Sequence, residues 1–284
     1  MAASAAVVVL VEEAAPAAAV AGSASHALAR ILVLGIPVDT MRCSEIERRI
    51  VAHLGSGPGN LLHIATVNPE YLVAADRDPA FRNALLKSDI LAPDGVGIVG
   101  AARVLERQPV ERVTGAQLVD RVLSDPVLTG ARVFLLGNPT SIAELQGRFP
   151  SRVVGRWGSG TPDPSDDTES ISRIRERSAN VVLVGYGAPA QVIWIERNRS
   201  ALEENGVAVA IGVGGALDFA AGTVGRAPRI VQRAGLEWAY RLAMEPWRWR
   251  RQLALPVFVW MVLRAWSERN RPKETGSMPY PLRR

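Results

Sequence analysis

Residues 61–94 read LLHIATVNPEYLVAADRDPAFRNALLKSDILAPD, two short apolar runs separated by a helical pattern. The runs at 61–67 and 89–94 are mostly apolar, which is typical of strands buried on both faces. The segment between them, 69–86, has helical spacing and begins at Asn68-Pro69, a capping side chain followed by proline at the first helical position. A strand, a helix and a strand in this order predict one unit of a parallel sheet.

The same alternation continues on both sides of this unit. Further apolar runs predict strands at 29–35, 131–137, 153–157, 179–185 and 207–215. Helical patterns lie between them at 43–54, 95–105, 114–123, 140–149, 170–178 and 189–206. The whole predicts an α/β fold: a mostly parallel, Rossmann-like sheet sandwiched by helices over residues 30–225.

The two ends of the chain differ from this domain in composition. Alanine, glycine and serine dominate residues 1–29, which predicts a disordered leader. Its apolar patch at 7–11 is interrupted by Glu12 and Glu13, so neither a signal peptide nor a membrane span is expected there. We expect a basic, Trp-rich helical appendage at 226–270 that docks on a membrane, and a disordered tail at 271–284.

Composition narrows the class of protein. With 284 residues and 48% hydrophobic content, the chain can fill the core of one large domain and still carry an appendage. The single cysteine, Cys43, excludes a disulfide framework and favours a reducing compartment, so we expect a cytoplasmic protein. The three histidines are scattered without metal-ligand spacing, which argues against a zinc site. The sequence contains no G-x-S-x-G, P-loop or paired-cysteine motif. Their absence argues against a hydrolase, an NTPase and a redox enzyme.

The positive charge is concentrated at the C-terminal end. From Arg226 onward there are thirteen Arg or Lys and four Glu, a net +9, which leaves −4 for the rest of a chain whose formal net charge is +5. The basic residues are mixed with tryptophan and not with a nucleic-acid-binding motif, so we expect no nucleic-acid partner.

Five of the seven tryptophans also lie in this segment, at positions 238, 247, 249, 260 and 266. Only twelve uncharged residues separate Arg251 from Arg264, whereas a bilayer span needs about 20. Tryptophan favours the headgroup level and arginine favours an anionic surface, so the segment predicts peripheral membrane binding. The alternative is a hydrophobic helix packed on the domain or in a homo-oligomer interface.

Ligands of such sheets gather at the carboxyl ends of the strands, where helix N-termini present unpaired N–H groups. The site is therefore expected at 66–68, 94–97, 137–138, 185–191 and 212–215. Asp94 follows one strand and precedes a helix, so it serves either as an N-cap or as a general base beside the cleft. Thr66 and Asn68 follow another strand. Their side chains either hydrogen-bond the backbone of a turn or helix cap, or donate and accept hydrogen bonds with a bound sugar or phosphate.

Two further side chains have equally open interpretations. Arg112 forms either a surface ion pair with Glu111 or a charged fork for a diphosphate. Gln191 is either a solvated helix residue or a ligand contact beside a glycine-rich strand end.

Two patterns resemble familiar ligand motifs. Residues 95–100, GVGIVG, satisfy the dinucleotide fingerprint, but Pro93-Asp94 separates them from the strand, which argues against a nicotinamide or flavin site. Asp76-Arg77-Asp78 spells a D-x-D metal motif, yet it falls within the predicted helix 69–86, where two solvent-facing carboxylates are the simpler interpretation.

Taken in order, several stretches resemble the WecG/TagA/CpsF glycosyltransferase family (glycosyltransferase family 26). They are TVNPEYLVAADRDPAFRNAL, DILAPDGVGIV, ERVTGAQL, VFLLGN, VVLVGYGAPAQVIWI, GVGGALDFAAGTVGRAP and GLEWAYRLAMEPWRWRR. The resemblance runs from about residue 31 to 266, and the combination of PDG, ER-x-x-G and the RAP…GLEW…EP block is specific to it.

The resemblance implies an inverting, metal-independent transferase that needs no cofactor and works in cell-surface polysaccharide synthesis. Its donor would be a UDP-sugar, with N-acetylmannosamine as the best-known case in the family. Its acceptor would be a sugar on a polyprenyl diphosphate at the inner face of the cell membrane.

The resemblance also implies the roles of single residues. The general base falls on Asp94, and the polar residues of the donor site fall on Thr66, Asn68, Arg112 and Gln191. Diphosphate contacts from the C-terminal appendage fall on Arg241, Arg248 and Arg251. The family commonly reads P-K-Q-E where this chain reads Pro189-Ala190-Gln191-Val192, a departure that bears on the identity of the donor sugar.

Two other functions compete with this one. A nucleotide-dependent oxidoreductase would use GVGIVG and be stabilised by NAD or FAD, whereas the transferase would be stabilised by UDP. A membrane-docked scaffold would bind lipid and no nucleotide.

Overall fold

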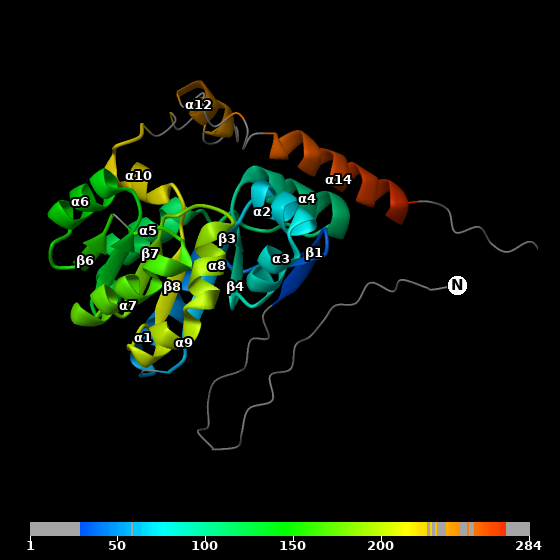
Figure 1. Cartoon of the computed structure of the whole chain (residues 1–284). Helices are drawn as coiled ribbons and strands as arrows, with labels where there is room; N and C mark the ends of the chain where they lie inside the picture. The colour runs from blue at the N-terminus through cyan, green and yellow to red at the C-terminus, as the bar shows by residue number, and fades with distance from the viewer. Residues whose placement is uncertain are drawn as a thin grey trace, which may run out of the picture.

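The structure, a computed structural model, describes residues 29–57, 59–158, 160–225, 228, 231, 237–244, 249 and 253–270. Its centre is a parallel six-stranded sheet in the order β4-β3-β8-β7-β5-β6 (Figure 1). The strands are β3 (Leu62–Val67), β4 (Ile90–Pro93), β5 (Val133–Leu136), β6 (Val153–Trp157), β7 (Val181–Val184) and β8 (Val209–Gly212). The predicted α/β fold with a mostly parallel sheet is confirmed.

Helices cover both faces of the sheet. One face packs against α1 (Cys43–Gly55), α5 (Gly115–Ser124), α6 (Pro139–Arg148) and α10 (Ala216–Ala221). The other packs against α2 (Pro69–Arg77), α3 (Pro79–Leu86), α7 (Asp167–Glu176), α8 (Ala190–Arg197) and α9 (Arg199–Glu204). Consecutive strand residues such as Ile64 and Ala65 are fully buried in opposite layers, which explains the continuous apolar runs.

The remaining elements lie around this sandwich. Helix α4 (Val96–Glu106) follows β4 and contacts α14 (Ala254–Arg269). Two short 3-10 helices are η1 (Pro126–Leu128) and η2 (Pro164–Asp166). Helix α12 (Glu237–Met244) lies between α10 and α14 in the chain. In Figure 1, α10 and α14 lie at the top and α1 and α9 at the bottom. The predicted leader and tail lie outside the described residues, apart from Ala29.

The run at 29–35 differs from its prediction. Strand β1 (Arg30–Val33) pairs antiparallel with β2 (Ile36–Asp39) in a separate two-stranded sheet. Leu34 and Gly35 have φ angles of 52° and 76°, the left-handed conformation at both positions of a tight two-residue hairpin turn. The sequence shows only the glycine, and the second strand was not predicted.

Two segments predicted as single helices are each divided. Between α2 and α3, Asp78 accepts hydrogen bonds from Ala80 N (2.9 Å) and Phe81 N (3.1 Å), because Pro79 ends one helix and starts the next. Between α8 and α9, the side-chain amide of Asn198 donates to Trp194 O (3.0 Å). In both places a polar side chain begins or ends a helix inside a continuous apolar pattern.

A buried polar network lies near the amino-terminal ends of β3 and β4. His63 of β3 has no exposed surface, and its Nδ1 lies 2.6 Å from the Glu196 carboxylate. Arg199 donates to the same carboxylate (2.8 Å) and to Asp89 (3.1 Å). Burial lowers the pKa of His63, whereas hydrogen bonds from His63 and Arg199 outweigh the burial of Glu196 and lower the pKa of that carboxyl to about 2.

This network predicts that acid destabilises the protein through His63. Below about pH 6.5, the ordinary pKa of histidine, the unfolded chain takes up a proton that folded His63 resists. The free energy of unfolding should therefore decrease as the pH is lowered below about 6.5. His63→Leu should reduce the slope of this free energy against pH by up to about 1.4 kcal/mol per pH unit. Urea unfolding of both proteins between pH 7.5 and 5.5 measures this, and equal slopes would contradict the prediction.

Candidate active site

The sheet topology predicts a ligand crevice at the carboxyl end of β8. The helix that follows β8, α10, lies on one face of the sheet, whereas α2 and α8, which follow the neighbouring strands β3 and β7, lie on the other. Loops that leave adjacent strands toward opposite faces open the crevice in which α/β proteins bind their ligands. The expected segments at 66–68, 185–191 and 212–215 all border this crevice.

Asp94 follows β4, on the β3 side of this predicted crevice, and is half-buried. Its backbone N–H donates to Val67 O at 2.7 Å, so the residue is still held by the sheet. Its carboxylate Oδ2 accepts from Gly115 N, the first residue of α5, at 3.4 Å. Val113 N donates to Pro93 O at 2.9 Å, which fixes the segment before α5 to the end of β4. The carboxylate is thus positioned by two strand ends and a helix start.

Gln191 holds the glycine loops of β7 and β8 together. Its Oε1 accepts from Gly187 N (3.0 Å) and from Gly214 N (2.9 Å), and it is only 2% exposed. Its Nε2 donates to the Tyr71 hydroxyl on α2 at 2.6 Å. A Cβ at Gly212 would lie 3.0 Å from that Nε2, so a glycine is needed where the amide crosses the end of β8. The predicted ligand contact therefore has its hydrogen-bonding capacity largely used inside the protein.

Thr66 and Asn68 flank the end of β3. Thr66 is 4% exposed, and its hydroxyl donates to Gly212 O at 2.9 Å, a bond between neighbouring strand ends. Asn68 accepts from Tyr71 N at 3.1 Å as the N-cap of α2. Its Nδ2 donates to no other described residue, so this half-buried amide can still donate to a ligand.

The predicted arginines fall into two groups. Arg112 is half-buried beside the strand end that carries Asp94, and its guanidinium forms no hydrogen bond or ion pair with any described residue. Glu111, its expected partner, lies 4.0 Å from Arg42 instead. Arg241 belongs to α12, but its side chain, like the whole of Arg248 and Arg251, lies outside the described part of the chain.

The predicted helix caps are confirmed. Asn68, Asn138 and Thr114 each accept from a backbone N–H in the first turn of α2, α6 and α5. The N-cap of α4 is Gly95, with a φ of 98°, so this helix has no side-chain cap. Helices α2 and α4 begin directly after β3 and β4, and α5 donates to Asp94, so the partial positive charge of these helix starts favours an anionic ligand near the two strand ends.

The dinucleotide-like glycines have another use in this fold. A Cβ at Gly97, the second glycine of GVGIVG, would lie 2.7 Å from Pro69 Cγ and 3.3 Å from Phe258 Cε1. In a dinucleotide site that glycine faces the pyrophosphate. Here it faces side chains of α2 and α14, which argues against the oxidoreductase alternative.

The D-x-D pattern is explained by helix geometry. Asp76 is exposed near the end of α2 and Asp78 caps α3. Within the described residues, no group of three or more His, Cys, Asp or Glu side chains is arranged to hold a metal ion.

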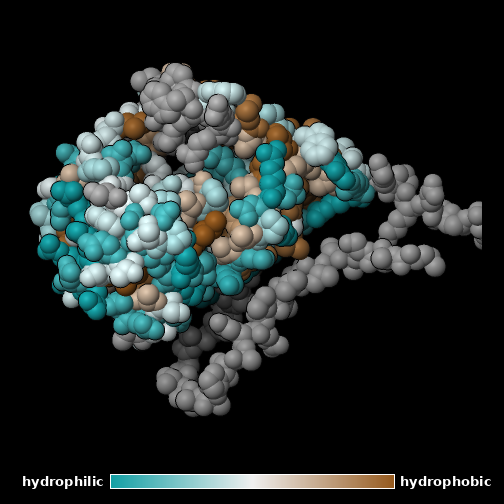
Figure 2. Space-filling model, viewed as in Figure 1, coloured by the Kyte–Doolittle hydropathy of each residue, from teal (hydrophilic) through white to brown (hydrophobic). Residues whose placement is uncertain are grey.

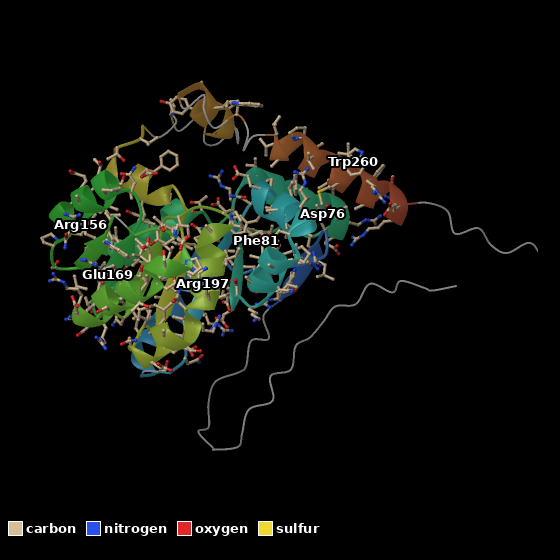
Figure 3. All side chains as sticks on the ribbon, in the orientation of Figure 1. Asp76, Phe81, Arg156, Glu169, Arg197 and Trp260 are labelled. Atoms are coloured by element: carbon tan, nitrogen blue, oxygen red, sulfur yellow. The ribbon has the colours of Figure 1, made fainter. Side chains whose placement is uncertain are left out.

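Helix α14 is apolar on two opposite sides. Phe258 and Val262 are buried against α2 and α4. Val259, Trp260, Leu263 and Trp266 face outward and are 48% to 59% exposed. Figure 2 shows hydrophobic residues along this helix, and Figure 3 shows Trp260 on it, with Asp76 on the neighbouring α2. Among the helices that the structure describes, none is long and apolar enough to cross a bilayer.

Two contacts of the site were missed from the sequence. Tyr71, 2% exposed, was not predicted, although it lies one turn after Asn68-Pro69. Phe258 was predicted only as part of the membrane-docking segment, and no sequence signal indicates its contact with Gly97. Val192, one of the two positions that depart from P-K-Q-E, is fully buried in the same core layer as residues of α2 and α3.

Comparison with known proteins matches this chain to one family of glycosyl transferases. The model of the glycosyl transferase WecG/TagA/CpsF family matches residues 31–272. The chain is similar to N-acetylglucosaminyldiphosphoundecaprenol N-acetyl-beta-D-mannosaminyltransferases from several bacteria. The Bacillus spizizenii protein is 31% identical over 246 residues, covering 85% of this chain and 93% of the relative.

Two other relatives carry the same name. The Staphylococcus aureus strain MW2 protein is 29% identical over 242 residues, covering 84% of this chain and 93% of that protein. The Bacillus subtilis strain 168 protein is 31% identical over 213 residues, covering 73% and 80%.

The position of Gln191 predicts a large loss of stability when its amide is removed. Gln191→Leu leaves the N–H groups of Gly187 and Gly214 without their acceptor, at about 1–3 kcal/mol each. The free energy of unfolding should fall by about 2–5 kcal/mol in urea titrations. The control Gln146→Leu removes only a surface contact with Arg156 and should cost under about 1 kcal/mol. Equal losses in the two variants would show that Gln191 is not the tie between the loops.

Proposed function

Because the chain belongs to the WecG/TagA/CpsF family of glycosyl transferases, we propose that it moves an N-acetylmannosamine-like sugar from a UDP-sugar to a polyprenyl-diphosphate-linked sugar. The relatives' names support the transferred sugar and the acceptor, since those proteins are named for moving N-acetyl-beta-D-mannosamine to N-acetylglucosaminyldiphosphoundecaprenol. The product would enter cell-surface polysaccharide synthesis.

The observation that carries the proposal is the position of Asp94. Its carboxylate accepts from the first N–H of α5, and its backbone is held at the carboxyl ends of β3 and β4, where α2 and α4 begin. Asp94 takes the proton of the acceptor hydroxyl as that oxygen attacks the anomeric carbon of the donor. The bond from this carbon to the diphosphate breaks on the opposite side, and UDP leaves with the electron pair. One direct displacement inverts the anomeric configuration.

Protein groups meet the charge that develops on the leaving diphosphate. Arg112 supplies a fixed positive charge, and the first turn of α4 supplies backbone N–H groups that no side chain caps. The side-chain amide of Asn68 adds a neutral donor on the same side. Arg241, Arg248 and Arg251 are candidates for further contacts from the C-terminal segment. This set of donors supports a transfer that requires no metal ion.

The outer side of α14 supports peripheral docking on the inner face of the cell membrane. Val259, Trp260, Leu263 and Trp266 recur at helical spacing and form one stripe. Sixteen residues of helix span about 24 Å, less than the roughly 30 Å of a hydrocarbon core, so the helix would lie along the interface. Docking there would bring the site close to a lipid-linked acceptor, because α14 packs directly on α2 and α4.

The role of Asp94 is tested by Asp94→Asn. The amide keeps an oxygen that can accept from Gly115 N but cannot take the proton, so kcat should fall by about 10²–10⁴-fold. Transfer from UDP-N-acetylmannosamine to a short-chain lipid-diphosphate-N-acetylglucosamine, followed by mass spectrometry, measures this. UDP should still raise the melting temperature of the variant. Asp76→Asn, on the exposed side of α2, is the matched control and should retain activity, whereas a fully active Asp94→Asn would refute the base assignment.

The docking stripe is tested by Trp260→Glu combined with Leu263→Glu. Two charges on the stripe should reduce binding to phosphatidylcholine–phosphatidylglycerol vesicles by about tenfold or more in co-sedimentation. Val127→Glu changes another exposed apolar side chain, 63% exposed on η1, and should bind as the unchanged protein does. If the double variant instead loses self-association and keeps vesicle binding, the stripe is an oligomer interface and the docking proposal fails.

A further inference from the structure

Phe258 of α14 lies at the junction of the two helices that follow the strands of the proposed site. Its ring is 4% exposed, and its Cε1 would lie 3.3 Å from a Cβ placed at Gly97 in the first turn of α4. Pro69, the first residue of α2, contacts the same glycine. One aromatic ring, one proline and one glycine therefore fill the corner between the starts of α2 and α4.

This corner is directly linked to the polar groups of the site. Asn68 precedes Pro69, and Asp94 lies three residues before Gly97. The two helices begin at the ends of β3 and β4, which are adjacent strands. A change in the spacing between the helix starts would therefore move the Asn68 amide relative to the Asp94 carboxylate.

Helix α14 also contacts the C-terminal end of α4. Arg269, its last residue, forms an ion pair with Glu106 at 2.7 Å and donates to Leu105 O. Phe258 and Arg269 thus contact the first and the last turn of α4, so α14 packs along the length of α4. Between them, Val262 packs on the same apolar layer.

We propose that Phe258 is a positioning residue for transfer. Its ring sets the spacing between the first turns of α2 and α4, and so holds Asp94 in the geometry that proton removal needs. The inference rests on the proposed role of Asp94 as the base. It gives α14 a second task beside lipid contact, because the buried side of the helix supports the base while the exposed stripe faces outward.

The test compares Phe258→Ala, Phe258→Leu and the control Val262→Ala with a water-soluble, short-chain acceptor that needs no membrane. All assays run well below the melting temperature of each variant. Phe258→Ala should lower kcat by about tenfold or more, since a shift of about 1 Å at a reacting group can cost far more than that. The KM for the UDP-sugar should change by less than about threefold, because no ligand contact is removed. Phe258→Leu should restore most of the rate, and Val262→Ala should stay within about twofold of the unchanged protein.

A second variant covers the case in which Phe258→Ala does not fold. Gly97→Ala places a methyl group against Pro69 and Phe258 from the α4 side and should lower kcat in the same way. If these variants lower only the melting temperature, or if Val262→Ala loses as much kcat as Phe258→Ala, Phe258 is an ordinary core residue and the inference is wrong. Asp94→Asn assayed in parallel separates the two levels. If Asp94→Asn is inactive and Phe258→Ala is active, only the positioning role fails, whereas an active Asp94→Asn removes the premise itself.

Discussion

The site depends on one buried amide, that of Gln191, which crosses the end of β8. Parallel strands deliver their following loops to one edge of the sheet, but nothing in the ladder of backbone bonds fixes those loops to one another. Gln191 does so by accepting from the β7 and β8 loops and donating to Tyr71 of α2. Thr66 adds a bond from β3 to Gly212. Four elements are thereby held together at the crevice, and Gly115 packs against Val213 beside them.

Helix α14 extends this order to the surface. A helix that is apolar on two opposite sides cannot satisfy both by packing on its own domain. One side is filled by the layer that also contains Ala65, Val67 and Ile98, which belong to β3 and α4. The other side carries tryptophans, and Arg264 lies over the Trp260 ring at 5.5 Å, an arrangement suited to a wet and partly apolar boundary. The helix therefore joins the interior of the proposed site to the surface proposed to meet lipid.

Sequence reasoning predicted what depends on local chemistry. Continuous apolar runs gave the buried strands, and Asn68-Pro69, Asn138-Pro139 and Thr114-Gly115 gave helix starts whose caps the structure contains. It did not predict the Leu34–Gly35 turn, because a leucine with positive φ has no sequence signal. Gln191 and Gly97 were interpreted from their neighbours in the chain, whereas their partners lie 23 or more residues away in Gly214, Tyr71, Pro69 and Phe258. Position at a strand end was predictable, but the partner of each side chain was not.

The use of Gln191 also determines how the glycine-rich loops act. Such loops often bind phosphate through their backbone N–H groups. Here the N–H groups of Gly187 and Gly214 already donate to Gln191, so these two glycines contribute close approach and not anion binding. Among the described residues, the donors without a protein side-chain partner include Arg112, the Asn68 Nδ2 and the uncapped first turn of α4. All three lie on the β3–β4 side of the crevice with Asp94. The proposed anion contacts and the proposed base therefore belong to neighbouring strand ends, whose helices α14 supports. For an in-line displacement the donor sugar would lie between them, so that Asp94 and the diphosphate face opposite sides of the anomeric carbon.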